Sequence, residues 1–125
     1  MTGSSLNKPL IVVDFKKHRI RIHKNTLLSI GCPENIFLLV NPEERSLVIL
    51  RSDCFYPRAH HISSGALEGI KSVELYSQSL VKTLRDVCSN WQEQKTYRLY
   101  GDIIPNEGIV RFYMPSALPV KESEL

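Results

Sequence analysis

Short apolar runs separated by turn-forming residues are the feature of this sequence that most constrains its fold. Leu10–Phe15, Asn35–Val40 and Ser46–Arg51 are each apolar over most of their length, and Thr96–Ile104 and Gly108–Met114 are rich in β-branched and aromatic residues. Runs of this length and composition, bounded by Gly, Pro and Asn, predict β-strands. Strands so close in sequence predict antiparallel pairing.

Two hairpins and a regularly alternating strand stand out. Residues 41–45 (Asn-Pro-Glu-Glu-Arg) separate two of the apolar runs, and residues 105–108 (Pro-Asn-Glu-Gly) separate another two. Both linkers have the composition of hairpin turns. The segment His18–His23 alternates strictly, which directs Ile20 and Ile22 toward a core and the other side chains to the opposite face.

One segment has the period of an amphipathic helix. Ser77–Trp91 carries apolar residues at helical spacing, with Ser77 as a candidate N-cap and with Lys82, Arg85 and other polar residues on the opposite face. A shorter helical turn is predicted at Asn25–Ile30, which Gly31 ends. The composition of residues 52–75 predicts a loop with one short strand near Lys71–Leu75. The apolar positions of the main helix are Leu80, Val81, Leu84, Val87, Cys88 and Trp91.

These patterns together predict an α+β fold. We expect mainly antiparallel β-sheet, or a small partly open barrel, of six or seven strands, with one long helix packed on it. The 125 residues are 42% hydrophobic and 23% charged, as in ordinary globular domains. We expect one domain over residues 9–120, with flexible tails at 1–8 and 121–125 because both ends are polar.

Composition indicates a cytoplasmic protein without a membrane partner. No apolar run approaches the roughly 20 residues of a membrane-spanning helix. The polar N-terminus lacks the apolar stretch of a secretory signal. The three cysteines, Cys32, Cys54 and Cys88, are widely spaced, and an odd, sparse set fits reduced thiols better than a disulfide framework.

Basic residues cluster in the segment Lys16–Lys24. Residues 1–62 hold nine Lys and Arg against five Asp and Glu, whereas residues 63–125 hold seven against eight. Alternation along a strand would set one row of side chains about 6.6–7 Å apart, close to the spacing of phosphates along a nucleic-acid strand. The candidate nucleic-acid-binding residues are Lys17, Arg19, Arg21, His23 and Lys24. The alternative is a solvated strand face whose charges prevent aggregation.

Residues 18–51 also carry a family resemblance. A basic strand, the turn Leu27, Ile30 and Gly31, a second strand, a short acidic turn and the closing strand Leu47–Leu50 follow one another. This order resembles the swapped-hairpin pattern of AbrB/MazE-type DNA-binding domains. The resemblance covers about 34 of the 125 residues, and it implies a homodimer that places Arg19, Arg21 and Lys24 near DNA.

No motif for catalysis, a cofactor or a metal was found. The sequence contains no GxSxG, HExxH, Walker or glycine-rich dinucleotide pattern. Cys54 with His60 and His61 is the nearest approach to a metal site or a Cys/His nucleophile pair, but no second pair of ligands lies at suitable spacing. We therefore expect no enzyme activity, no cofactor, no metal and no small-molecule ligand.

The sequence thus predicts a non-catalytic binding module. One hypothesis is nucleic-acid binding, with a regulatory role, through the basic strand. The alternative is a protein-interaction or self-association domain. For the latter, Tyr97, Tyr100, Phe112 and Tyr113 could form an aromatic surface on the second hairpin, or could simply pair across its strands.

Overall fold

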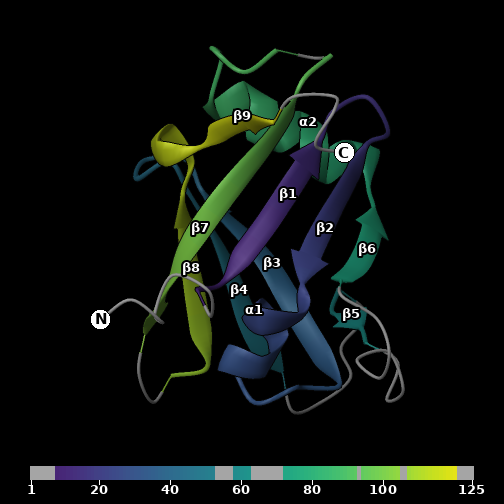
Figure 1. Ribbon diagram of the computed structural model, residues 1–125, viewed down its shortest axis with the longest axis vertical. Coiled ribbons are helices and arrows are strands. Elements are labelled where there is room, and N and C mark those ends of the chain that lie inside the picture. Colours follow the sequence, from purple (N-terminus) through teal and green to yellow (C-terminus); the bar gives the residue numbers. More distant parts are fainter. Residues whose placement is uncertain (1–7, 53–57, 63–71, 93, 105–106, 121–125) are drawn as a thin grey trace.

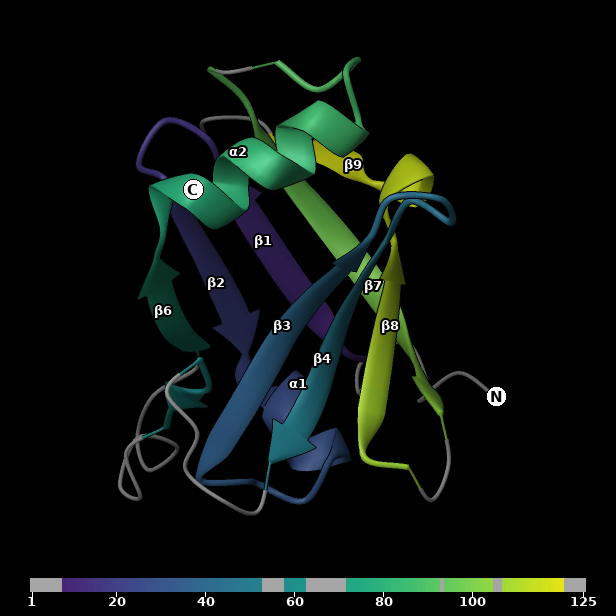
Figure 2. The same cartoon turned by 180° about the vertical axis from the view of Figure 1, so that it is seen from behind.

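A computed structural model describes residues 8–52, 58–62, 72–92, 94–104 and 107–120. Within them, nine strands form one curled antiparallel sheet, and two α-helices lie at its opposite ends (Figures 1 and 2). The strands are β1 (Leu10–Asp14), β2 (Arg19–His23), β3 (Asn35–Asn41), β4 (Ser46–Ser52), β5 (His60–His61), β6 (Ser72–Tyr76), β7 (Thr96–Ile104), β8 (Ile109–Tyr113) and β9 (Leu118–Val120). The helices are α1 (Lys24–Ser29) and α2 (Gln78–Val87).

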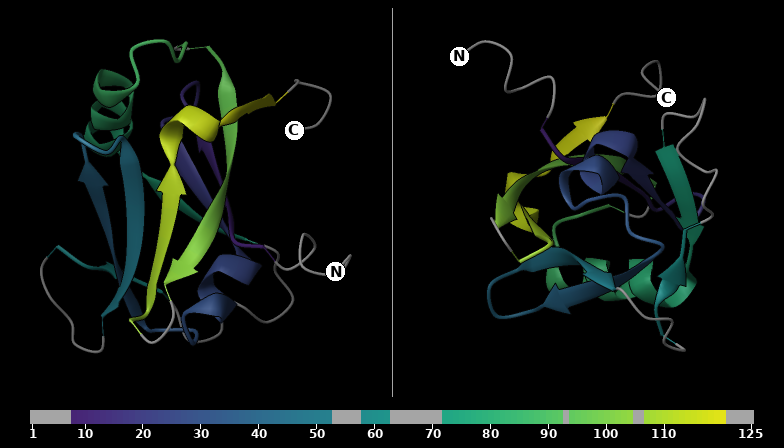
Figure 3. Two further views of the ribbon diagram at one scale, coloured as in Figure 1. Left: turned by 90° about the vertical axis from the view of Figure 1, so that its left-hand side faces the viewer. Right: turned by 90° about the horizontal axis from the view of Figure 1, so that it is seen from below.

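The sheet curls into an incomplete barrel (Figure 3). Its strand order is β5-β3-β4-β8-β7-β1-β2-β6, and β9 pairs with the first residues of β7. The path of strands begins at β5 and ends at β6, so the ring is open between these two edge strands, and α2 lies behind the opening when seen from below. β6 pairs with β2, and α2 follows β6 directly in the chain. The β1–β2 turn therefore lies close to the start of α2.

The long strand β7 joins the two halves of the sheet at Gly101. Its first half pairs with β1, as in Leu10 opposite Tyr100, and its second half pairs with β8, as in Gly101 opposite Phe112. A Cβ atom at Gly101 would lie 2.6 Å from the Phe112 ring and 2.7 Å from Val110. Glycine therefore lets β7 pass close to the core where it changes partner.

The core fills the inside of the barrel. Alternate residues of the strands point inward, and both helices add apolar side chains to the same cluster. At least 12 large side chains are almost completely buried, which stabilises the fold by about 1.5–3 kcal/mol for each. They are Ile11, Val13, Ile20, Ile22, Leu27, Ile36, Leu47, Ile49, Leu84, Leu99, Phe112 and Met114.

The prediction of a mainly antiparallel sheet is confirmed, but its details differ. Nine strands occur in the described residues instead of six or seven, since β5 and β9 have only two and three residues and leave no readable alternation. The predicted helix Ser77–Trp91 has Ser77 as its N-cap but ends at Val87. Trp91 is still buried, because a turn in which its N–H donates to the Cys88 carbonyl returns it to the core.

The structure also differs from the prediction of one long helix. Ten residues form α2, and the helical turn predicted at Asn25–Ile30 is a second helix, α1, whose six residues bury Leu27. The strand predicted near Lys71–Leu75 is β6. No helix in the described ranges combines the length and apolar character that a membrane span requires. The predicted tails fall almost entirely outside the described residues.

The four aromatic residues of the second hairpin do not form one surface. Only Gly101–Ile104 of β7 pair with β8, so Tyr97 pairs with β1 and β9 instead. Tyr97 and Phe112 are buried, whereas Tyr100 and Tyr113 point to the outside. Neither cross-strand aromatic pairing nor a continuous aromatic patch results.

Candidate nucleic-acid interface

The predicted basic row lies on β2, on the outer face of the sheet. Arg19, Arg21 and His23 are half-buried and alternate with the buried Ile20 and Ile22, as the sequence predicts. Because β2 runs between β1 and β6, the outward Arg19 and Arg21 have cross-strand neighbours on both sides. These neighbours decide whether the charges can meet a partner.

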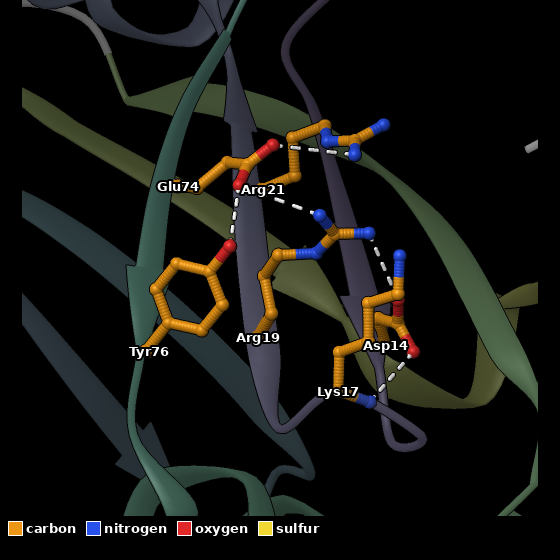
Figure 4. A network of polar contacts seen from close by, with 6 residues as sticks. All are labelled: Asp14, Lys17, Arg19, Arg21, Glu74 and Tyr76. Atoms are coloured by element: carbon orange, nitrogen blue, oxygen red, sulfur yellow. Dashed lines mark hydrogen bonds and ion pairs between the residues drawn. The ribbon is translucent and has the colours of Figure 1, made fainter.

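The two arginines of the row are held in an ion-pair network with acidic residues of the neighbouring strands (Figure 4). Arg19 Nη2 lies 3.0 Å from Asp14 Oδ2 on β1, and Arg19 Nη1 lies 3.3 Å from Glu74 Oε2 on β6. Arg21 Nη2 lies 3.3 Å from Glu74 Oε1. The Tyr76 hydroxyl donates a hydrogen bond to Glu74 Oε2 at 2.8 Å. We call Asp14, Arg19, Arg21, Glu74 and Tyr76 the strand-face network.

Burial and pairing shift the pKa values of Glu74 and Arg19. The Arg19 and Asp14 side chains are only 12% and 5% exposed. The hydrogen bond from Tyr76, with the charges of Arg19 and Arg21, lowers the pKa of Glu74 although partial burial opposes this. Burial disfavours the charged form of Arg19, but hydrogen bonds to Tyr76 and Asp14 and the nearby carboxylates outweigh it, so its pKa is raised. Every charge in the network therefore meets an opposite charge inside the protein.

The other three predicted residues, Lys17, His23 and Lys24, take no part in the ion pairs of the strand-face network. Lys17 is exposed in the turn between β1 and β2, and its backbone N–H donates to Asp14 Oδ1 at 3.1 Å. His23 caps α1, since its Nδ1 accepts from the N–H of Asn25 at 3.1 Å. Lys24 is the first residue of α1 and is half-buried. The five predicted residues thus lie in the β1–β2 turn, on β2 and at the start of α1, and they have different local roles.

A second group of basic residues comes together at the end of the barrel where the β1–β2 turn meets α2. A cleft of about 510 Å³ lies between these elements. Lys16 and His18 line it from the turn, and Lys82, Arg85 and Asp86 line it from α2. Lys16 and Lys82 are exposed. Among the lining residues described, three cationic side chains face one acidic side chain, which favours an anionic ligand. We call this feature the cationic cleft.

Local backbone structure holds the two sides of the cleft together. His18 has a φ of 51°, a left-handed conformation that completes the turn into β2. The His18 carbonyl accepts a hydrogen bond from the N–H of Ser77, the N-cap of α2, at 3.1 Å. The side chain of Ser77 in turn accepts from the N–H of Leu80 at 3.2 Å. The turn is therefore attached directly to the start of the helix.

The sequence contained part of the signal for this cleft. Lys82 and Arg85 lie three residues apart, and so on the same side of the predicted helix. Lys16 belongs to the basic segment before β2. What the sequence could not show is that β6 pairs with β2, because that pairing brings the helix next to the turn.

The cysteine and histidine candidates lie elsewhere. Cys54 is outside the described residues. His60 is on β5, where burial lowers its pKa, and His61 Nδ1 lies 3.3 Å from Asn35 Oδ1. Cys88 is buried on α2's C-terminal side, and burial raises the pKa of its thiol. Within the described ranges, no three His, Cys, Asp or Glu side chains gather as metal ligands.

Comparison with known proteins gives no match. No protein-family model matches the chain, and searches of curated proteins and of solved structures find no similar protein. The functional argument therefore depends on the site itself.

Proposed function

We propose that this protein is a non-catalytic nucleic-acid-binding module and that it binds with the cationic cleft and its surroundings. The observation that carries the proposal is the convergence of Lys16, Lys82 and Arg85 on one cleft against the single acidic residue Asp86 among the lining residues described. Lysine and arginine bind phosphate groups by charge and hydrogen bonding. A cluster from two separate elements provides such contacts in a fixed arrangement.

Neighbouring cations extend this surface. Lys17 follows Lys16 in the exposed β1–β2 turn, and Lys95 lies in the connection between α2 and β7, where it is also exposed. The Lys95 carbonyl accepts a hydrogen bond from the N–H of Phe15, so this connection lies next to the turn. Of the residues predicted from sequence, Lys17 belongs to this surface. Arg19 and Arg21 are better explained by their ion pairs with Asp14 and Glu74.

Salt-dependent binding tests the proposal. A fluorescein-labelled oligonucleotide is titrated with the protein at several salt concentrations, and fluorescence anisotropy gives the affinity. The double variant Lys16→Gln/Lys82→Gln should weaken binding and reduce the slope of log K against log salt by about 2, one for each lost phosphate contact. Both side chains are exposed, so the fold should be unaffected.

The double variant Arg58→Gln/Arg111→Gln is the matched control. Both residues are exposed, neither lines the cleft, and the change in net charge is the same. This control should retain the wild-type slope. Equal loss in both double variants would show that net charge alone drives binding, and no binding of the wild-type protein would refute the function.

Self-association is the second candidate, and a separate surface favours it. On the outer face of β3, β4 and β8, Leu39 lies opposite Val48, and Phe37 lies opposite Leu50, which in turn lies opposite Ile109. Leu39 is 49% exposed. Exposed apolar patches on a sheet often mark protein–protein contacts. The AbrB/MazE resemblance of residues 18–51 also implies a dimer, and that remains a prediction.

Light scattering coupled to size-exclusion chromatography tests this second candidate. If the apolar face joins two copies, the protein elutes as a dimer at low and high salt, and Leu39→Glu converts it to a monomer. Leu118→Glu is the matched control, since Leu118 is 52% exposed on β9, outside this face. A wild-type monomer at all concentrations tested would exclude the candidate.

A further inference from the structure

The cationic cleft has the size of a binding site for a small organic group. Its volume of about 510 Å³ lies within the roughly 300–1,000 Å³ typical of ligand pockets. A bare phosphate contact on a protein surface needs no such cavity. The cleft is lined by Phe15, Lys16, His18, Gln78, Val81, Lys82, Arg85, Asp86 and Gln94.

Hydrogen bonds and an aromatic cluster hold the cleft in place. Phe15 at its floor packs edge-on against Trp91 and Tyr97, with ring centroids 5.6 and 6.0 Å away, and Trp91 stacks on Tyr97 at 4.9 Å. Arg85 Nε donates to the Trp91 carbonyl at 3.1 Å, which orients the guanidinium. The floor of the cleft and the Arg85 guanidinium are therefore already ordered, and binding against them costs less conformational entropy.

Three kinds of chemistry meet in this cleft. Lys16, Lys82 and Arg85 provide positive charge. Phe15 and Val81 belong to the core and reach the floor of the cleft with only the 5% and 2% of their surface that stays exposed. The amides of Gln78 and Gln94 and the carboxylate of Asp86 offer hydrogen-bond donors and acceptors.

A nucleotide can use all three, because it joins an anionic phosphate to a sugar with hydroxyl groups and to a flat base with a polar edge. A phosphate alone would use only the cations and would be repelled by Asp86. A purely apolar ligand would make no use of the positive charge of the exposed Lys16 and Lys82.

We infer that the cationic cleft binds one nucleotide unit, and that the protein therefore prefers single-stranded nucleic acid to duplex. This inference rests on the proposed function and specifies its ligand. In a duplex the bases are stacked and paired, so a duplex can offer the cleft only its phosphates unless a base is flipped out. An unpaired strand, or a free mononucleotide, can bring phosphate, sugar and base together.

Three probes test the inference on the full-length protein. A labelled single-stranded 12-mer should bind roughly tenfold more tightly than the duplex of the same sequence, the effect of one favourable base contact. Adenosine 5′-monophosphate should displace the single strand at concentrations where inorganic phosphate, compared at equal ionic strength, does not.

A variant without change of charge separates the base contact from the phosphate contact. Gln94→Ala should reduce the preference for the single strand by several-fold and leave the duplex affinity and its salt slope unchanged. Gln92→Ala is the matched control: it is exposed in the same connection, and its side chain does not line the cleft. Lys82→Gln should weaken both nucleic acids.

The outcomes distinguish this inference from the proposed function. Equal affinity for single strand and duplex, with no displacement by the mononucleotide, would overturn the nucleotide cleft and leave nucleic-acid binding intact. Binding of the mononucleotide without binding of either nucleic acid would support the nucleotide cleft and refute the proposed function. Failure of all three probes to bind would overturn both.

Discussion

The protein has two groups of basic residues that differ in their surroundings. In the strand-face network, Arg19 and Arg21 lie 3.0–3.3 Å from carboxylate oxygens of Asp14 and Glu74. In the cationic cleft, the exposed Lys16 and Lys82 come from a turn and a helix and line a cavity. The first group neutralises charge within the fold, and the second presents charge to solvent.

The difference follows from the secondary structure that carries each group. A residue on an inner strand has neighbours on both adjacent strands, with Cβ atoms about 4.5–5.5 Å away directly across a pair. Arg21 therefore faces Glu74 in register on β6, and Arg19 faces Asp14 on β1. A lysine in a turn or on the outer side of a helix has no such fixed neighbour. Basic residues are thus more available to a ligand at the end of this barrel than on its side.

The largest expected effect comes from breaking the strand-face network at Arg19. Arg19→Ala leaves the buried carboxylate of Asp14 without its ion-pair partner, and among the described residues the Lys17 N–H is the donor that stays. We expect the free energy of unfolding to fall by about 3 kcal/mol, the lower end of the range for a buried pair that loses one partner. Urea denaturation at pH 7 measures this.

Lys82→Ala is the control for that experiment and sharpens the comparison between the two groups. Lys82 is exposed, so its removal should change the free energy of unfolding by no more than about 0.5 kcal/mol. If Arg19→Ala were as stable as Lys82→Ala, the strand-face arginines would not be structural, and the original prediction of a nucleic-acid-binding strand would regain support.

Much of the fold could be predicted from local pattern. Period-two alternation identified β2, apolar runs bounded by turn residues identified β1, β3, β4, β7 and β8, and helical spacing identified α2. The two shortest strands could not be found, because two or three residues carry no periodicity. The partner change within β7 could not be found either, since it depends on how Gly101 packs against Phe112.

The candidate site was only partly predictable for a similar reason. Alternation correctly indicated that Arg19 and Arg21 face outward, away from Ile20 and Ile22. It could not indicate what they face, because Glu74 lies 53 residues after Arg21 in the sequence. The same long-range pairing of β2 with β6 brings Lys82 toward Lys16. Local sequence gives the direction of a side chain, and strand pairing decides its partner.

The next largest effect concerns the pH dependence of the strand-face network. Because the folded-state pKa of Glu74 is lowered, its contribution to stability is present above the ordinary glutamate pKa and is lost as the pH falls through the folded-state value. Glu74→Gln should cost up to about 1 kcal/mol at pH 7, since the side chain is partly exposed and solvent screens the pairs. The difference from wild type should shrink below about pH 4.3.

Thermal and urea unfolding between pH 3 and pH 7 measure this difference. Asp102→Asn is the control, since Asp102 is an exposed carboxylate of the same sheet outside the network. A Glu74→Gln deficit that stayed constant across this pH range would mean that the residue acts through packing, not through its charge.

The smallest expected effect is that of the Tyr76 hydroxyl. Tyr76 is 66% exposed, and its hydroxyl donates to Glu74 Oε2 at 2.8 Å. Tyr76→Phe removes this bond while keeping the ring, and it should cost about 0.5 kcal/mol, the low end for a hydrogen bond that water can replace. It should also raise the pKa of Glu74, because that bond is the main cause of the lowered value.

Carboxylate chemical shifts followed by NMR across the titration would detect the change, with Tyr113→Phe as the exposed control. An unchanged Glu74 titration would show that the two arginines alone hold its charge, and that the network needs only its ion pairs to keep β2 from presenting positive charge to a ligand.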